Sequence, residues 1–491
     1  MGKKGSETST HFEMNSLAYF FEPESIAVIG PLREFFFGSH PIIKNLLEAS
    51  FKGKIYPIGL TCSNILGLKV YASIKNVPQK IDLVLIAANL QMIPNVMIEC
   101  AEKGIKAIVI VSDGFAERNE EVFLLEKKIV EIAKQSDIRF IGPNTAGILN
   151  TKNDFICCPF IMGQGKIRSG GIALCGENRI IGPHTFPYAD LHYGVSKICD
   201  LGNKSDVDES DMLEYLENDP STKVIAMHLE NIREGKRFLK VARRVTYKKP
   251  VLVLKAGQTN REGMVPTLRT GSLPLDDQIF NAACKQVGII LLEKLDELFE
   301  IPKYFAYQPL PKGNKFGIIS YTGMGAALAA DVGAKYNLSV AEFSPETISK
   351  LDAISPFLCK TIIDLGPLTA LKSDYMSIYP EILKAVLEDD NIDCLFHILW
   401  ADPAGAFIGD YAKIFRKLRG ISQKPVVIWV CGPRLRNIYD LTHNLEDLGF
   451  PVFSNLETAI KAIGVAYQYA IWKKKTHEGI EHLLFTGDMF R

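Results

Sequence analysis

The sequence lacks the features that mark several classes of protein. Lys plus Arg and Asp plus Glu both number 56, so there is no basic surplus with which a nucleic-acid-binding protein displaces counterions. No apolar run approaches the roughly 18 residues that a membrane-spanning helix needs. The ten cysteines include no C-x-x-C pair, so a zinc site has no local support and no metal ligands are assigned. We therefore expect neither a nucleic-acid nor a membrane partner.

The cellular compartment is predicted from the lack of a recognisable signal peptide. The first ten residues, MGKKGSETST, are polar and contain no apolar core of a signal peptide. Many free thiols without a secretory signal are typical of a reducing compartment. We therefore expect a cytoplasmic protein with a disordered N-terminus at residues 1–17.

What the sequence does contain is an alternation of short apolar runs with amphipathic helical stretches. In the first third, runs rich in β-branched residues predict strands at 25–30, 53–59, 81–87, 107–112 and 138–142. Near-continuous apolar strands separated by helices are typical of a parallel sheet that is covered on both faces. These residues therefore predict a doubly wound, nucleotide-binding-like domain.

The same alternation restarts twice. The second series predicts strands at 170–176, 195–202, 223–230, 250–257 and 288–293, and the third at 316–325, 361–366, 394–400, 425–432 and 450–455. Two prolines and a glycine between these series predict a linker with few interdomain contacts. The fold class is therefore α/β, with three doubly wound, mainly parallel Rossmann- or flavodoxin-like domains. The predicted boundaries are 18–150, 151–306 and 314–472, with the linker at 307–313 and a tail at 473–491.

The loop after the first predicted strand, GPLREFFFGSH, lies where such folds usually bind a pyrophosphate. Gly30 and Gly38 would let the backbone approach an anion, Ser39 adjoins Gly38, and Arg33 would add positive charge. The motif G-x-G-x-x-G is absent, and three consecutive phenylalanines suggest packing against a partner or an adenine ring. A ligand cradle and a plain βα loop are equally compatible with this stretch.

Three further loops follow the carboxyl ends of strands in the same domain, where an open parallel sheet binds its ligands. The candidate cofactor contacts in these loops are Ala88, Asn89, Ser112, Gly114 and Asn144. Gly and Asn are also common turn formers, so each residue alone has an ordinary explanation. Their position at one sheet edge is what favours a site.

Several stretches occur in an order and spacing that one family shares. They include FFEPESIAVIG, FKGKIYPIG and RFIGPNTAGILNT in the first domain and DLGNKSDVDESDMLEYLENDPSTKVIAMHLENI in the second. On these stretches, residues 18–470 resemble the α subunit of ADP-forming (NDP-forming) acyl-CoA synthetases, of the succinyl-CoA synthetase superfamily. The resemblance implies a CoA-binding Rossmann-like domain followed by two succinyl-CoA-synthetase-like flavodoxin domains, with CoA as the cofactor.

The resemblance also implies a protein partner. In the family, ATP, ADP and Mg²⁺ are bound by an ATP-grasp domain, and no such domain is recognised in this chain. Any ATP chemistry would therefore need an ATP-grasp β-type subunit or another protein subunit. We expect a homo- or hetero-oligomer.

The family's chemistry is a phosphate relay in which a histidine within the motif S-H-T-G-S-L carries the phosphoryl group. Here Arg269 stands at the histidine position, because residues 268–273 read LRTGSL. A guanidinium remains protonated and has no lone pair with which to attack phosphorus. We therefore expect Arg269 to hold a phosphate or carboxylate, or to pair with Glu230, which matches the family glutamate beside the histidine.

A second departure concerns the turn after the first strand of the second domain. The family has S-Q-S-G there, whereas residues 176–179 of this chain read GENR. The carboxylate of Glu177 would repel a phosphate, while a guanidinium would attract one. The phosphate-binding candidates are Asn178, Arg179, Thr270, Gly271 and Ser272.

Three functions remain open, because fold similarity alone does not choose among them. The favoured hypothesis is a CoA- or acyl-CoA-linked protein without the phosphohistidine relay, which binds an acyl-CoA or an acyl phosphate. The second is a functional ADP-forming acetate- or acyl-CoA ligase α subunit that works with an ATP-grasp β subunit. The third is a scaffold or regulatory subunit without chemistry. If the chain is catalytic, the resemblance implies an acid–thiol ligase type of reaction.

Overall fold

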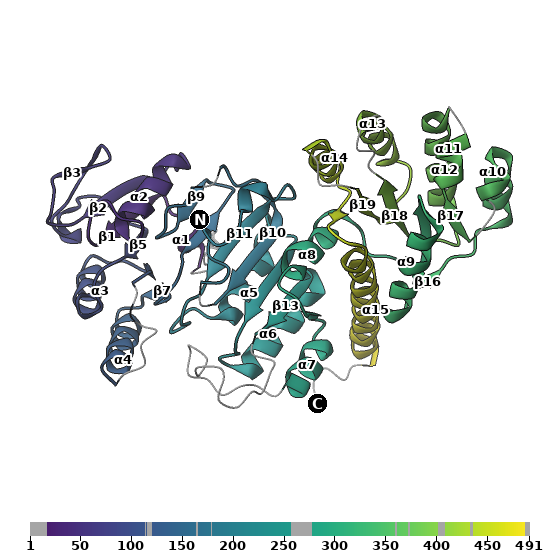
Figure 1. Ribbon diagram of the computed structural model, residues 1–491. Coiled ribbons are helices and arrows are strands. Elements are labelled where there is room, and N and C mark those ends of the chain that lie inside the picture. Colours follow the sequence, from purple (N-terminus) through teal and green to yellow (C-terminus); the bar gives the residue numbers. More distant parts are fainter. Residues whose placement is uncertain are drawn as a thin grey trace, which may run out of the picture.

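The structure is a computed structural model in which three twisted sheets follow one another along the molecule (Figure 1). It describes residues 17–112, 114, 120–163, 165–177, 179–256, 277–358, 361–371, 374–400, 408–432 and 436–486. The α/β class with mainly parallel sheets is confirmed. No helix within these ranges is long and apolar enough to cross a membrane.

The first sheet is wholly parallel and has the order β2-β1-β5-β6-β7. Its strands are β1 (Ser25–Ile29), β2 (Lys54–Ile58), β5 (Leu83–Ile86), β6 (Ala107–Ile110) and β7 (Arg139–Ile141). The helices are α1 (Ala18–Phe21), α2 (Ser39–Glu48), α3 (Ile93–Glu102) and α4 (Glu120–Gln135), with 3-10 turns at Ile74–Asn76 and Leu90–Met92 and a small hairpin of β3 (Asn64–Ile65) and β4 (Leu68–Lys69). Every residue of β5 and β6 is buried, as expected for strands covered on both faces.

The second sheet has the order β14-β13-β12-β10-β11-β8-β9. Its strands are β8 (Ile148–Asn150), β9 (Phe155–Cys157), β10 (Ser169–Gly176), β11 (Val195–Asp200), β12 (Val224–Leu229), β13 (Val251–Lys255) and β14 (Ile290–Leu292). The helices are α5 (Glu209–Asn218), α6 (Gly235–Lys248), α7 (Asp277–Gln286) and α8 (Glu297–Tyr307), with a 3-10 turn at Tyr188–Asp190. Strands β8 and β9 are antiparallel, and β8 joins the second sheet by pairing with β11.

The third sheet is again parallel. It contains β15 (Lys315–Ser320), β16 (Ser339–Val340), β17 (Ile362–Asp364), β18 (Cys394–Trp400), β19 (Val426–Cys431) and β20 (Val452–Phe453). The helices are α9 (Gly323–Lys335), α10 (Pro345–Ile354), α11 (Gly366–Leu371), α12 (Tyr375–Glu388), α13 (Ile408–Leu418), α14 (Arg436–Asp447) and α15 (Leu456–Thr486), with a 3-10 turn at Pro356–Leu358. Helix α15 packs against both α8 and α9, and so links the second and third sheets (Figure 1).

Gln308, which lies within the stretch predicted to be a linker, makes specific contacts with the third domain. The Gln308 side chain donates to the Gly449 carbonyl (2.6 Å) and accepts from the Val426 amide (2.8 Å). Buried Tyr304 on α8 and Phe316 on β15 belong to one hydrophobic core. Both hydrogen bonds come from one side chain of the 307–313 stretch, and Tyr304 and Phe316 lie outside it, so the expectation of few interdomain contacts stays a prediction.

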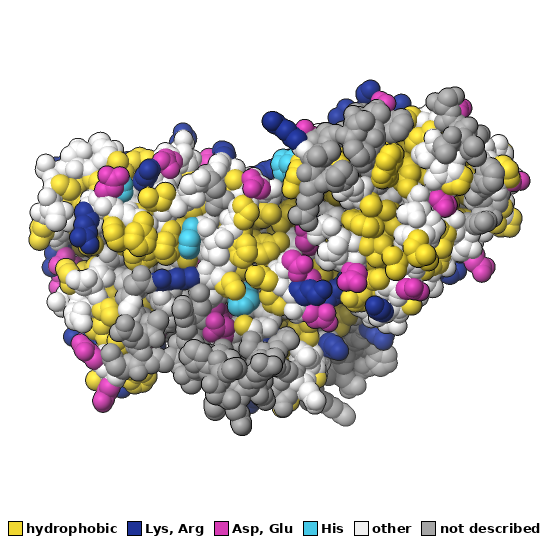
Figure 2. Space-filling view, in the orientation of Figure 1, with side chains coloured by type: hydrophobic (Ala, Val, Ile, Leu, Met, Phe, Trp, Pro, Cys, Tyr) yellow, Lys and Arg dark blue, Asp and Glu magenta, His cyan; other side chains and the backbone are white. Residues whose placement is uncertain are grey.

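Charges are mixed on the face shown in Figure 2, where Lys and Arg alternate with Asp and Glu across all three domains. This distribution agrees with the formal net charge of zero.

Candidate functional site

The carboxyl end of β1 and the N-terminus of α2 approach each other closely at Gly30. Its φ is 151°, and a Cβ there would lie 2.4 Å from both the Ala87 carbonyl oxygen and the Ser39 Oγ. Real Cβ contacts are never this short, so only glycine fits. The loop predicted from sequence therefore does bring the backbone of the first strand against the start of α2.

The start of α2 has the features of an anion cradle. Gly38 is its N-cap with φ 113°, and Ser39 is its first residue. The Ser39 Oγ is buried and has no hydrogen-bond partner in the described part of the chain. First-turn amides and an unsatisfied hydroxyl at a helix N-terminus suit a phosphate, so these residues fit a phosphate group of CoA.

Arg33 lies on the exposed part of the same loop. Its guanidinium lies over the Phe35 ring, 5.5 Å from the centroid. Phe35 and Phe36 are both largely exposed. The charge is therefore available at the rim of the cradle, beside exposed aromatic rings.

The structure brings several of the other predicted residues to the same sheet edge. The Ser112 hydroxyl donates to the Ala88 carbonyl (2.7 Å), so it ties together the loops after β5 and β6. Asn89 is exposed, and Gly114 has φ 96° with its Cβ position 2.8 Å from a Leu90 methyl group. Ser112 thus has a structural partner already, whereas Asn89 faces solvent.

Asn144 turns away from this edge. Its side-chain amide donates to Asn203 Oδ1 (3.3 Å) in the second domain. The residue is buried and has φ 61°, a conformation that Asn tolerates better than most residues. In this structure Asn144 joins two domains.

The first-domain loop meets the second domain at the turn that carries Arg179. The Gly38 amide donates to the Pro159 carbonyl (2.8 Å), and the rings of Phe37 and Phe160 lie 4.9 Å apart. The guanidinium of Arg179 lies over both rings, 5.7 Å and 6.0 Å from their centroids. The predicted CoA loop and the predicted phosphate turn are therefore neighbours.

The buried Asp200 holds the backbone of that turn by a hydrogen bond. Asp200 Oδ1 accepts from the Arg179 amide (3.2 Å). Burial raises the pKa of Asp200 to about 6, although backbone amides hydrogen-bonded to it lower the pKa. Burial also lowers the pKa of nearby His184 to about 4, with a contribution from Arg179, so this imidazole is neutral near pH 7.

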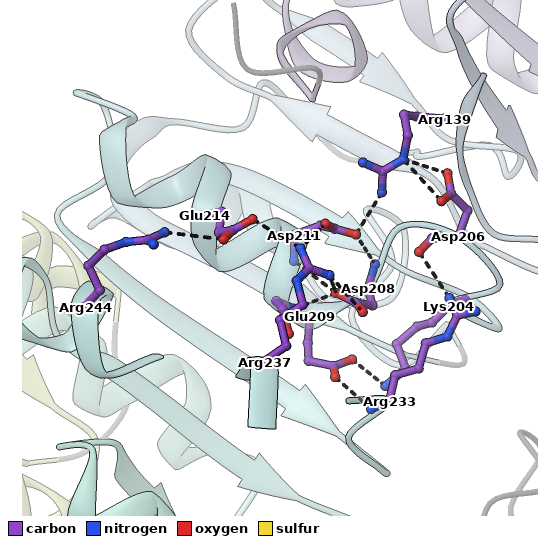
Figure 3. Close-up of polar contacts among 11 residues, drawn as sticks. Arg139, Lys204, Asp206, Asp208, Glu209, Asp211, Glu214, Arg233, Arg237 and Arg244 are labelled. Atoms are coloured by element: carbon purple, nitrogen blue, oxygen red, sulfur yellow. Dashed lines mark hydrogen bonds and ion pairs between the residues drawn. The ribbon is translucent and has the colours of Figure 1, made fainter. Parts of the chain in front are cut away.

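Glu177, which we expected to repel a phosphate, forms an ion pair that the sequence did not predict. Figure 3 shows two members of the surrounding network, Lys204 and Glu209. The Glu177 Oε1 lies 2.8 Å from Lys204 Nζ, which is also 2.8 Å from Glu209 Oε2 and donates to the Asn231 carbonyl. Burial raises the pKa of Glu177 to about 7, against the lowering effect of Lys204; Glu209 and Glu230 raise it further. Lys204 therefore offsets part of the repulsion inferred from the Glu177 carboxylate, although it is shared with Glu209.

The same segment ties the first domain to the second (Figure 3). Asp208 caps α5 by accepting from the amides of the first turn, and Asp211 completes the capping box. Arg139 on β7 binds Asp206 (3.0 Å) and Asp211 (2.9 Å), and Arg237 on α6 binds Asp208 (3.3 Å). The acidic run DVDESD thus serves helix capping and domain docking, and its spacing matches the capping signal.

Some predicted residues lie outside the described ranges: Asn178, Arg269, Thr270, Gly271 and Ser272. Glu230 is described, and its Oε2 is buried without a hydrogen-bond partner in the described part of the chain. The predicted pairing of Glu230 with Arg269 stays a prediction. Cys175 is buried and its pKa is raised to about 12 by burial, which suits a structural residue rather than a nucleophile.

The first two domains are mainly parallel α/β domains. The first has a glycine-bearing loop after its first strand, and a polar turn of the second domain lies beside that loop. This arrangement is typical of a nucleotide- or CoA-binding class of protein. Family models agree: residues 24–151 match the CoA binding domain, and residues 170–305 match the succinyl-CoA ligase like flavodoxin domain.

The particular family is shown by relatives that match nearly the whole chain. The α subunit of acetate–CoA ligase (ADP-forming) II from Pyrococcus furiosus is 33% identical over 459 residues, covering 92% of this chain and 98% of that protein. The acetate–CoA ligase (ADP-forming) II of Archaeoglobus fulgidus is 35% identical over 471 residues, covering 95% of this chain and 69% of that protein. The chain belongs to the ADP-forming acyl-CoA synthetase α-subunit family, in the succinyl-CoA synthetase superfamily.

Solved structures agree with this assignment. A Pyrococcus horikoshii protein is 31% identical, with a TM-score of 0.82, over 93% of this chain and 99% of that one. The dinucleotide-forming acetyl-coenzyme A synthetase 1 of Ca. Korarchaeum cryptofilum, in complex with phosphate and ADP, is 27% identical. Its TM-score is 0.84, over 95% of this chain and 99% of that one.

Proposed function

We propose that this chain is a CoA- or acyl-CoA-binding subunit that has lost the phosphohistidine relay of its family. The observation that carries the proposal is Arg269, which stands where the family motif has its histidine. A permanently protonated guanidinium does not accept a phosphoryl group, but it binds phosphate or carboxylate oxygens in bidentate geometry. In this proposal Arg269 and Arg179 are fixed ligands of an acyl phosphate, a phosphate or an acyl carboxylate.

The first domain would hold CoA at the edge formed by the ends of β1, β5 and β6. Gly30 and Gly38 let the backbone approach, and the buried Ser39 hydroxyl and the α2 amides would bind a phosphate of CoA. Arg33 would pair with a second phosphate from the rim. When bound, CoA supplies the thiol that carries the acyl group.

The second domain would face this thiol with the turn at 176–179. Arg179 lies beside the first-domain loop through Phe37 and Phe160. Lys204 holds Glu177 and thereby limits the negative charge at the turn. An anionic acyl group or acyl phosphate would therefore meet the Arg179 guanidinium beside a carboxylate whose charge Lys204 partly offsets.

The second candidate is a working ligase α subunit, and the relatives favour it, since two of them are named as α subunits of ADP-forming acetate–CoA ligases. It requires an ATP-grasp β-type subunit that supplies ATP, ADP and Mg²⁺, in a hetero-oligomer. It also requires a phosphoryl carrier other than Arg269.

Calorimetry with CoA and acetyl-CoA on the isolated chain tests the binding part of the proposal. The proposal expects binding that weakens in Arg33→Ala. Failure of both ligands to bind would favour a scaffold without chemistry. Transfer of labelled phosphate to the chain would instead favour the working ligase.

A further inference from the structure

A groove of about 770 Å³ lies between α7, the edge strand β14 and α15, low in the centre of Figure 1. Asn281 and Lys285 line it from one face of α7, and Gln468, Trp472 and Lys475 line it from one face of α15. None of the candidate-site residues that the structure describes lines it. Its volume lies within the roughly 300–1,000 Å³ of small-molecule sites.

One wall of the groove is a rigid aromatic surface. The Trp472 indole N–H donates to the Gln286 carbonyl (3.3 Å), and its ring stacks on Tyr469 with centroids 6.0 Å apart and planes 18° apart. A Cβ at Gly288, where φ is 78°, would lie 2.5 Å from the indole, so glycine lets the ring seat against the turn. The Tyr469 hydroxyl is in turn anchored on the Thr246 carbonyl. The indole is thus held in place without a ligand.

The rim of the groove is positively charged. Lys285 and Lys475 are exposed, and neither has an ion-pair partner in the described part of the chain. The one acidic residue among the lining side chains, Glu293, pairs with Lys461 (2.9 Å). Among the described lining side chains, no carboxylate is therefore left to neutralise the two lysines.

We propose that this groove binds a small organic anion with a flat apolar body, of the aromatic carboxylate type. The flat body would pack against the groove-facing side of Trp472 and against the apolar residues of β14, and the carboxylate would pair with Lys285 and Lys475. The side-chain amides of Asn281 and Gln468 would add hydrogen bonds at the rim. The proposal rests on residues other than the described residues of the candidate CoA site.

The test uses the full chain and two probes that differ only in charge, 2-naphthoate and 2-naphthamide. Each is titrated by calorimetry into the parent chain, into Lys285→Gln/Lys475→Gln, and into Lys335→Gln/Lys384→Gln. The last variant removes two exposed lysines elsewhere and matches the change in net charge. Circular dichroism confirms that each variant is folded.

We expect naphthoate to bind the parent and the matched control equally, and the groove variant at least about tenfold more weakly, or about 1.4 kcal/mol. Naphthamide should bind more weakly than naphthoate and equally to all three chains. Trp472→Ala should weaken both probes, because it removes part of the apolar wall of the groove. The proposal is overturned if naphthoate does not bind the parent, or if the matched control loses as much affinity as the groove variant. Equal affinity for the charged and neutral probes would also overturn it.

Discussion

Removal of the Lys204 side chain should destabilise the second domain strongly, because its one positive charge is shared by two buried carboxylates. Its Nζ lies 2.8 Å from each of Glu177 and Glu209, and the exposed fraction is 2% for Lys204 and 0% for both glutamates. Breaking a buried ion pair on one side typically costs about 3–5 kcal/mol, since an uncompensated charge stays behind. We predict that Lys204→Met lowers the free energy of unfolding by this amount near pH 8.

The loss should shrink on acidification. Burial raises the pKa of Glu177 to about 7 even with Lys204 in place, and removing the lysine would raise the pKa further. The folded variant then binds a proton that the unfolded chain, with its ordinary glutamate pKa, binds only at lower pH. The variant therefore gains stability as the pH falls through its own Glu177 pKa, which lies above 7, whereas the parent gains from this proton only below about 7. The deficit should therefore narrow as the pH falls from above 8 towards about 7, and should stay constant at lower pH.

Urea unfolding at several pH values, with hydrogen exchange across α5 and β12 to locate the effect, measures this prediction. Lys248→Met is the matched control, because the Lys248 side chain is 51% exposed and its partner Glu217 keeps an ion pair with Arg244 (2.8 Å). It should cost less than about 1 kcal/mol. A Lys204→Met variant no less stable than this control near pH 8, or a deficit that does not change with pH, would refute the reasoning.

Three further outcomes are expected. Gly30→Ala should abolish CoA binding in calorimetry and lower the midpoint of thermal unfolding, because its Cβ would meet Ala87 and Ser39 at 2.4 Å; unchanged binding would remove the loop from the CoA site. Arg33→Ala should weaken CoA binding by roughly 1–3 kcal/mol with little change in stability, since the side chain is exposed and a charge-assisted hydrogen bond would be lost. Glu177→Gln should flatten the stability–pH curve between about pH 5 and 7, because the raised pKa of Glu177 makes the parent lose stability as the pH rises through that range; urea unfolding of both chains at matched pH values checks this.

Much of the fold could be predicted because its strands are apolar on both faces. The run at 107–112 contains β6 (Ala107–Ile110), and the run at 394–400 coincides with β18 (Cys394–Trp400). Strands β8 and β9 were missed as separate elements, because the polar run NTKND at 150–154 leaves only a few apolar residues on either side.

A site residue could be predicted where the chemistry of that one residue determines its role. It could not be predicted where its role depends on a partner that only the fold brings near. Gly30 could be predicted because a strand-to-helix turn needs close backbone approach. The Glu177–Lys204 pair could not, because the two residues are 27 positions apart and only the fold brings them together. The same holds for Asn144, whose turn-forming character was clear but whose contact with Asn203 in the second domain was not.

The central claim, that residues 267–273 carry no phosphoryl group, has a direct measurement. The chain is incubated with labelled ATP, Mg²⁺ and an ATP-grasp subunit of a relative, beside an α subunit that has the S-H-T-G-S-L motif as positive control. Acid-labile label is then measured on the parent and on Arg269→Ala. The account predicts label on the positive control and none on either form of this chain; acid-labile label on the parent that disappears in Arg269→Ala would contradict it.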